Sequence, residues 1–175
     1  MKKMAADFIW TEKAIQNALY CFCALKRHEL IVPNSKVFGW ESDMVSVTQA
    51  GYMFEFEVKL SRSDFRADAK KIKSQYMVNP IQQSWGKAVG VNRPNYFYYV
   101  VPPDLVAVEE LPSFAGLIYA EWHPPDYALY CQPARVIRIA PKLHTDKINE
   151  WQRRQLHRAV TFRYWRDRLG VFHDG

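Results

Sequence analysis

With 175 residues, 49% of them hydrophobic and 15% aromatic, the chain is long enough to bury one core, and we expect a single domain over residues 1–175. Its three cysteines lack paired Cys-x-x-Cys spacing, which argues against a structural zinc site and favours a reducing, cytoplasmic location. No stretch approaches the roughly 20 apolar residues that a membrane span needs. The formal net charge of +6 favours an anionic partner.

The first predicted element is a helix from Thr11 to about Leu25. Thr11 is a suitable N-cap, and Ile15, Leu19 and Phe22 recur at helical spacing, so they predict the buried side. Glu12 lies one turn before Ile15. An acid at this position is also what the positive end of a helix dipole favours.

The most informative stretch is a predicted hairpin of two strands, residues 42–48 and 51–61, joined by a turn at 49–51. Strict alternation in the second strand indicates two different faces. One face would carry Phe54, Phe56, Val58 and Leu60. The other would carry Met53, Glu55, Glu57 and Lys59. If the turn centres on Ala50, paired residue numbers sum to about 100, and Asp43 lies opposite Glu57 on a shared face.

Two carboxylates and an ammonium group on one patch of sheet can be interpreted in two ways: as a solvent-exposed strand face or as a metal-binding catalytic site. Charged residues that alternate with apolar ones are the usual water-facing side of a strand. However, carboxylate oxygens are also the ligands that Mg²⁺ prefers, and a nearby lysine can stabilise an attacking hydroxide or developing negative charge. Glu41 shares a face with Asp43 and is the alternative ligand if the register differs.

After Lys59 the hydrophobic period changes, and we expect a helix from about Ser61 to Tyr76. Ser61 or Ser63 would cap it, and Phe65 begins its buried stripe. Polar and basic residues that could follow a nucleic-acid backbone lie on the remaining surface: Ser61, Arg62, Arg66, Lys70, Lys71 and Lys73. Between residues 59 and 73 there are six basic and two acidic residues, a clustering typical of a polyanion-binding surface.

The residues of this region resemble a known family. Asp43 followed by Glu57-Val58-Lys59 resembles the signature of the PD-(D/E)XK nuclease superfamily, and the continuation through Ser61, Asp64 and Phe65 is closer to its MmcB-like DNA repair proteins. The similarity covers roughly residues 8 to 120. It departs at Ser42, where the superfamily has proline, and at residues 77–94, which look like an insertion.

This resemblance implies a restriction-endonuclease-like fold and a set of roles. Asp43, Glu57 and the carbonyl of Val58 would hold Mg²⁺ or Mn²⁺, and Lys59 would orient the attacking water. Glu12 would then be the helix glutamate that many members direct at the metal. The products would carry 5′-phosphate and 3′-hydroxyl ends.

Downstream, residues 77–95 are predicted to form a long basic loop. Residues 96–101 are apolar throughout, as in a buried central strand, and further strands are expected at 117–122, 127–131 and 135–139. A basic helix would span about 145–169 from an N-cap at Thr145. Its buried stripe would consist of Ile148, Trp151, Gln155, Ala159 and Phe162, with the arginines exposed.

Together these features predict an α/β fold: one mixed, partly antiparallel sheet with flanking helices. The function we expect is a Mg²⁺- or Mn²⁺-dependent deoxyribonuclease of DNA repair, recombination or defence, with DNA as partner and no small-molecule cofactor. Two alternatives stay open: a DNA-binding module that no longer cleaves, and a protein-interaction domain for an acidic partner. The sequence also leaves room for a homodimer.

Overall fold

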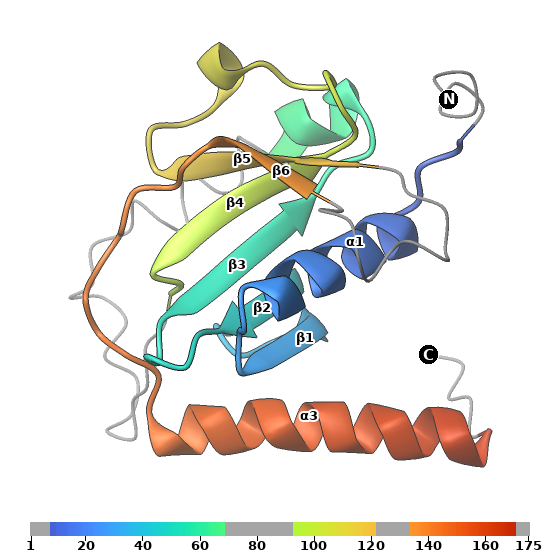
Figure 1. Cartoon of the computed structure of the whole chain (residues 1–175), viewed down its shortest axis with the longest axis vertical. Coiled ribbons are helices and arrows are strands. Elements are labelled where there is room, and N and C mark those ends of the chain that lie inside the picture. Colours follow the sequence, from blue (N-terminus) through green and yellow to red (C-terminus); the bar gives the residue numbers. More distant parts are fainter. Residues whose placement is uncertain (1–7, 69–92, 122–133, 171–175) are drawn as a thin grey trace.

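The computed structural model describes residues 8–68, 93–121 and 134–170, and in these it has six strands in one sheet with helices on both faces (Figure 1). The helices are α1 (Glu12–Leu25), a 3₁₀ turn η2 (Val108–Glu110), α3 (Glu150–Leu169) and the helical residues 62–68. The strands are β1 (Leu30–Ser35), β2 (Ser42–Val47), β3 (Met53–Val58), β4 (Tyr96–Val101), β5 (Ala115–Ala120) and β6 (Ala134–Arg138). None of the described helices is long and apolar enough to cross a membrane.

The strands lie in the sheet in their order along the chain, from β1 at one edge to β6 at the other. β1, β2 and β3 are antiparallel neighbours, β3, β4 and β5 run parallel, and β6 is antiparallel to β5. The predicted mixed α/β sheet with flanking helices is therefore confirmed. The expected strand at 127–131 and most of the loop at 77–95 lie outside the described residues.

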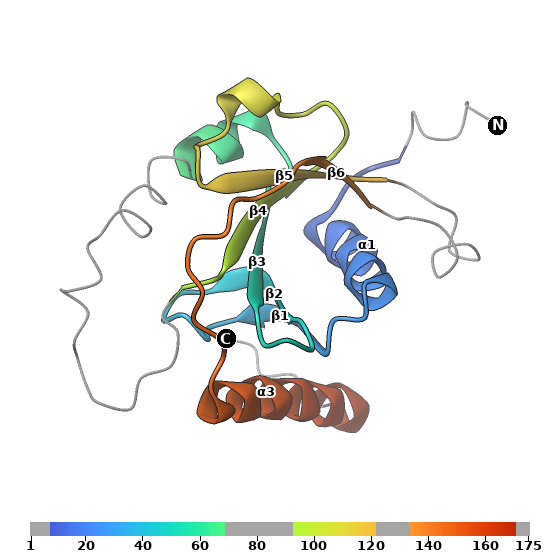
Figure 2. The same cartoon turned by 60° about the vertical axis from the view of Figure 1, so that its left-hand side comes forward.

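Helix α1 covers one face of the sheet, as its spacing predicts (Figure 2). Thr11 is its N-cap, and the Thr11 side chain accepts a hydrogen bond from the backbone N–H of Ala14 at 3.2 Å. Ile15 and Leu19 are fully buried. They pack on the side of the sheet that Phe56 and its neighbours present. This packing fixes the N-terminal end of α1, and with it Glu12, at the side of the sheet where β3 ends (Figure 1).

The face of the sheet opposite α1 is covered by two elements, the helical residues 62–68 and helix α3. Phe65 from the helical residues 62–68 is buried with Phe97 and Tyr99 of β4 and with the segment around η2. Leu156 of α3 packs on Val45 and its neighbours near the β1 edge. The sequence predicts a half-buried β3, and this was wrong: Met53 and Glu55 are 0% and 1% exposed, and Lys59, just beyond the strand, is 6% exposed. A strand with neighbours on both sides and helices over both faces has no water-facing side.

The C-terminal helix was predicted with the wrong start, and its buried stripe was predicted correctly only in part, since Ile148 and Ala159 do pack in the cluster of Leu156. Residues 145–149 are not helical, and Asn149, not Thr145, is the N-cap, with its side chain accepting from the backbone N–H of Gln152 at 2.8 Å. The helix buries Gln152 and Leu156, whereas Trp151 and Phe162 are 59% and 65% exposed. Aromatic residues here suggested an inward stripe, but the contacts of the helix with β1 decide which side faces in.

The segment between β6 and α3 is held to the start of β3 by one buried side chain. The carboxamide of Asn95 accepts from the backbone N–H of Met53 at 2.7 Å. It donates to the carbonyls of His144 and Asp146 at 3.0 and 2.8 Å. Because Asn95 is fully buried, these hydrogen bonds have no water to replace them.

Candidate active site

Asp43 and Glu57 meet where β2 and β3 pair. Met44 pairs with Phe56 and Val45 with Glu55, so the ladder has the predicted register, and one step further Asp43 faces Glu57. The carboxylate of Asp43 also accepts a hydrogen bond from the backbone N–H of Val58 at 2.7 Å. That bond fixes the Asp43 side chain against β3, between Glu57 and the strand end.

Lys59 completes the group and is enclosed by acids. Its ammonium donates to Oε1 of Glu57 at 2.7 Å. It lies 3.6 Å from Oδ1 of Asp68 and 3.8 Å from Oδ1 of Asp64, both on the helical residues that follow β3. The side chains of Lys59 and Glu57 are only 8% and 16% exposed. The ammonium is therefore held beside the carboxylate pair in a site that excludes most water.

It is unfavourable for Asp43 and Glu57 to be ionised at the same time in this site. Burial and then the charge of Asp43 raise the pKa of Glu57 to about 8, against the opposing hydrogen bond from Lys59. Burial also raises the pKa of Asp43, and the charge of Glu12 adds to this. Burial alone would lower the pKa of Lys59, but the hydrogen bond to Glu57 and the surrounding carboxylates outweigh burial and raise it. Two half-buried carboxylates that resist ionising together form a site that a cation would stabilise.

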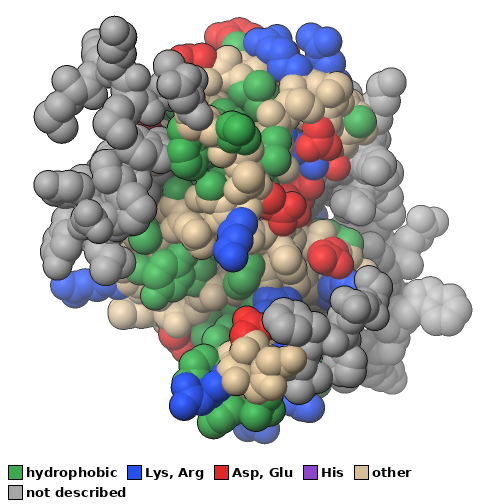
Figure 3. Space-filling view, turned by 90° about the vertical axis from the view of Figure 1, so that its right-hand side faces the viewer, with side chains coloured by type: hydrophobic (Ala, Val, Ile, Leu, Met, Phe, Trp, Pro, Cys, Tyr) green, Lys and Arg blue, Asp and Glu red, His purple; other side chains and the backbone are tan. Residues whose placement is uncertain are grey.

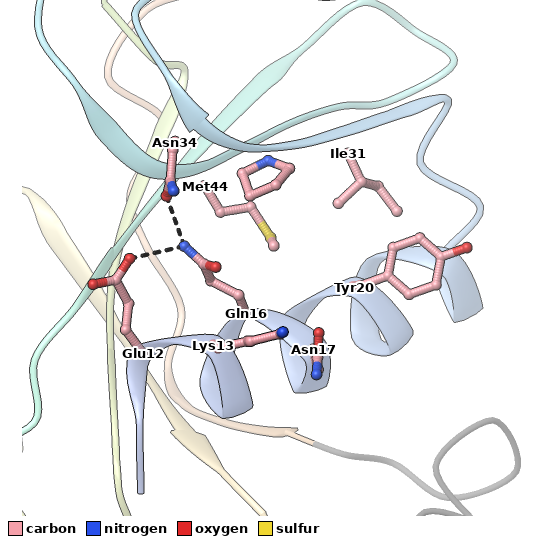
Figure 4. A pocket seen from close by; sticks show the side chains of 9 residues that line it. Glu12, Lys13, Gln16, Asn17, Tyr20, Ile31, Asn34 and Met44 are labelled. Carbon is pink, nitrogen blue, oxygen red and sulfur yellow. Dashed lines mark hydrogen bonds between the residues drawn. The ribbon is translucent and has the colours of Figure 1, made fainter. Parts of the chain in front are cut away.

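Glu12, on α1, is exposed and lies near enough for its charge to act on Asp43. Its carboxylate accepts from Nε2 of Gln16 at 3.0 Å, and the same nitrogen lies 2.8 Å from Oδ1 of Asn34 and 3.0 Å from the backbone carbonyl oxygen of Asp43 (Figure 4). Gln16 thus connects α1 to the backbone that carries Asp43. Figure 3 shows the face onto which β3 and the start of α1 point, where acidic side chains follow one another with a few basic ones beside them.

The donor set fits a hard divalent cation. Among the described residues, Oδ1 of Asp43 and Oε2 of Glu57 have no hydrogen-bond partner, so each carboxylate keeps one oxygen for a ligand. The resemblance to PD-(D/E)XK nucleases implies a third metal ligand, the backbone carbonyl of Val58, and this residue directly follows Glu57. Magnesium is commonly held by one or two protein carboxylates and several waters, so it needs no larger set. The described part of the chain has no cluster of three or more His, Cys, Asp or Glu residues that could hold a metal ion.

No family model and no curated protein matches the chain. A solved structure of a protein of unknown function from Silicibacter pomeroyi, SPO1766, is similar in fold, with a TM-score of 0.60. The two sequences are 20% identical, and the similarity covers 97% of this chain and 99% of that chain. The comparison supports the architecture and says nothing about the chemistry of the site.

The predicted nucleic-acid contacts are placed only in part. Ser61 caps the helical residues 62–68, accepting from the backbone N–H of Asp64 at 3.2 Å. Arg62 forms an ion pair with Glu110 at 3.3 Å, and Arg66 is exposed. Lys70, Lys71 and Lys73 lie outside the described residues. Arg66 is therefore the described basic side chain of this helix that is most accessible to a ligand.

Two acidic neighbours of Asp43 have other roles. Glu41, the alternative ligand, is exposed and pairs with Lys36 at 3.2 Å. Glu55 is buried, and its Oε1 accepts from Nε1 of Trp40 at 2.7 Å and from the hydroxyl of Ser42 at 2.6 Å. Glu55 therefore secures the segment that enters β2, and Asp43 remains the partner of Glu57.

Sequence reasoning missed three residues around Lys59. Asp64 and Asp68 were assigned to the helix that follows, yet both face back to the ammonium. Their four-residue spacing puts them on one side of a helix, and that signal was available in the sequence. The third, Tyr99, is fully buried on β4. Burial and the charges of Asp68 and Glu57 raise the pKa of its hydroxyl well above its usual value.

Proposed function

We propose that this protein is a divalent-metal-dependent deoxyribonuclease that hydrolyses DNA phosphodiester bonds. The observation that carries the proposal is the half-buried pair of Asp43 and Glu57 with the ammonium of the buried Lys59 2.7 Å from Glu57. The pair is destabilised by its own charge, which a Mg²⁺ or Mn²⁺ ion would relieve. The resemblance to PD-(D/E)XK nucleases points to the same residues and the same chemistry.

The residues divide the work as follows. A bound Mg²⁺ or Mn²⁺ ion would supply Lewis-acid chemistry, polarising the scissile phosphate and its water ligand. Asp43 and Glu57 would hold the ion, and the N–H of Val58 keeps Asp43 in place for this. Lys59 would direct its ammonium at the attacking water or at the charge that develops on the phosphate. Asp64 and Asp68, which lie 3.8 and 3.6 Å from that ammonium, would keep it at the site if Glu57 served the ion instead.

The test is cleavage of labelled single-stranded, duplex and branched DNA in Mg²⁺ or Mn²⁺. Lys59→Met keeps most of the aliphatic stem and removes the charge, and we expect it to lower the cleavage rate by about 10²–10³-fold. DNA affinity should change little, because one cation contributes a small share of binding. Lys36→Met, which removes a lysine that pairs with a glutamate on the surface, is the matched control and should cleave like wild type.

Metal binding is measured separately. Isothermal titration with Mg²⁺ should give one saturable event in wild type, which Asp43→Asn or Glu57→Gln abolishes. A wild-type protein that binds Mg²⁺ and DNA without cleaving any DNA form would identify a binding module. Cleavage by Lys59→Met at the wild-type rate would contradict the catalytic assignment.

A further inference from the structure

Beside the candidate active site, the structure has a hollow of about 600 Å³ between α1 and the strands β1 and β2 (Figure 4). Its volume lies in the range of small-ligand sites, about 300–1,000 Å³. Ile31, Pro33 and Met44 give it an apolar lining from the sheet. A flat apolar group can pack against this lining without leaving a buried polar atom that lacks a hydrogen-bond partner.

The helix side of the hollow has a different character. Gln16 and Asn17 contribute side-chain amides, Lys13 contributes a cation, and Tyr20 an aromatic ring. Tyr20 is 53% exposed. In Figure 4, Tyr20 and Ile31 lie at one end of the hollow and Glu12 and Asn34 at the other. Glu12 adds a carboxylate to the same side, so the lining carries one cation and one anion. A ligand with a flat face and a hydrogen-bonding edge matches this combination.

The hollow lies on the face of the sheet that α1 covers, and Gln16 links it to the candidate active site. Glu12, Gln16 and Asn34 belong to its lining, and Nε2 of Gln16 lies 3.0 Å from the carbonyl oxygen of Asp43. A group in the hollow is therefore next to the strand end that carries the carboxylate pair. For a DNA strand whose phosphate lies at that pair, this is the hollow that an adjacent nucleotide would meet on the α1 side of the sheet.

We infer that the hollow binds an unpaired nucleotide that flanks the scissile phosphate, so that the substrate is single-stranded DNA or the unpaired part of a branched or frayed end. The inference rests on the proposed function. The base would lie against Ile31 and Met44 with its edge toward the amides, and Tyr20 would close the outer end. A paired base cannot enter, because its faces are stacked and its edge is already hydrogen-bonded.

Two substitutions test this with little risk to the fold. Asn17 is exposed, so Asn17→Trp fills the hollow without disturbing the core. Tyr20→Ala removes the ring at its outer end. The matched control is Tyr164→Ala, because Tyr164 is 57% exposed on α3 and does not line the hollow. Because Tyr20 closes the end of the hollow without carrying the whole stack, Tyr20→Ala should weaken binding by about 5-fold, the lower limit for the loss of an aromatic contact to one base.

The experiment is a titration of full-length protein with dT₆, with a fully paired DNA hairpin and with inorganic phosphate, all in EDTA. The readouts are affinity and the side-chain amide NMR signals of Gln16, Asn17 and Asn34. We expect dT₆ to shift these signals, and both hollow variants to bind dT₆ more weakly than wild type and Tyr164→Ala. Equal affinity in all four proteins, equal shifts with the paired hairpin, or the same shifts with phosphate alone would overturn the inference.

Because EDTA prevents metal-dependent cleavage, the two proposals fail separately. Binding of dT₆ in the hollow by a protein that cleaves nothing in Mg²⁺ or Mn²⁺ would refute the nuclease and leave the nucleotide site standing. A nuclease whose dT₆ affinity is indifferent to Asn17→Trp and Tyr20→Ala would refute the nucleotide site alone.

Discussion

Removing one candidate metal ligand should stabilise the protein at alkaline pH. The pKa of Glu57 is raised from its ordinary value of 4.5 to about 8 in the folded chain. A group whose pKa is higher when folded contributes stability at low pH and loses it as pH rises to that value. Wild type should therefore lose stability between pH 4.5 and about 8, as Glu57 ionises beside Asp43.

The interval from 4.5 to about 8 corresponds to at most roughly 5 kcal/mol. Glu57→Gln keeps the size of the side chain and removes its charge, so this loss disappears. The amide still accepts a hydrogen bond from Lys59 but no longer forms an ion pair, which offsets part of the gain. We expect the variant to match wild type near pH 5 and to be about 2–4 kcal/mol more stable near pH 8.5.

The assay is urea unfolding at intervals from pH 5 to 9, in EDTA, with the free energy of unfolding plotted against pH. Glu41→Gln, the same change at an exposed glutamate, is the control and should follow the wild-type curve. Saturating Mg²⁺ should flatten the curve of wild type and leave Glu57→Gln unchanged. Parallel curves for wild type and Glu57→Gln in EDTA would refute the reasoning, because they would mean that Glu57 ionises without cost.

Three further predictions concern other parts of the molecule. Burial lowers the pKa of His28 from 6.5 to about 4, so stability present above pH 6.5 should fall by at most about 3 kcal/mol as pH drops to 4. His28→Gln should lack this component in the urea assay extended down to pH 4, and an unchanged curve would contradict it. Asn95→Ala should lower the free energy of unfolding by roughly 3 kcal/mol or more, because it leaves the N–H of Met53 and two carbonyls unsatisfied; a loss under 1 kcal/mol in chemical denaturation would count against this network. If Arg66 contacts a phosphate, Arg66→Ala should reduce the slope of log affinity against log salt by about one in DNA titrations, and an equal slope would remove it from the interface.

The sequence by itself determined the elements whose signals are local. Thr11 before a helical apolar stripe predicts α1, because capping and one-sided burial both depend on neighbours within a few residues. The turn at Gly51, whose φ is +84°, fixes the register that sets Asp43 against Glu57. The fold class followed from the same signals, since a hairpin, a helix and an all-apolar strand in that order favour a mixed sheet with helices on both faces.

Only the tertiary structure decided how deeply the site is buried and which acids surround Lys59. Alternation in β3 is compatible with a water-facing side. The buried Met53 packs in one cluster with Leu156 of α3, which comes from a distant part of the chain, and Glu55 is enclosed by Trp40 and Ser42. The exposed Trp151 has the same cause, because an amphipathic pattern with aromatic residues all round does not say which stripe the sheet will meet. Side-chain period is a property of one element, whereas burial and pKa depend on everything that packs against it.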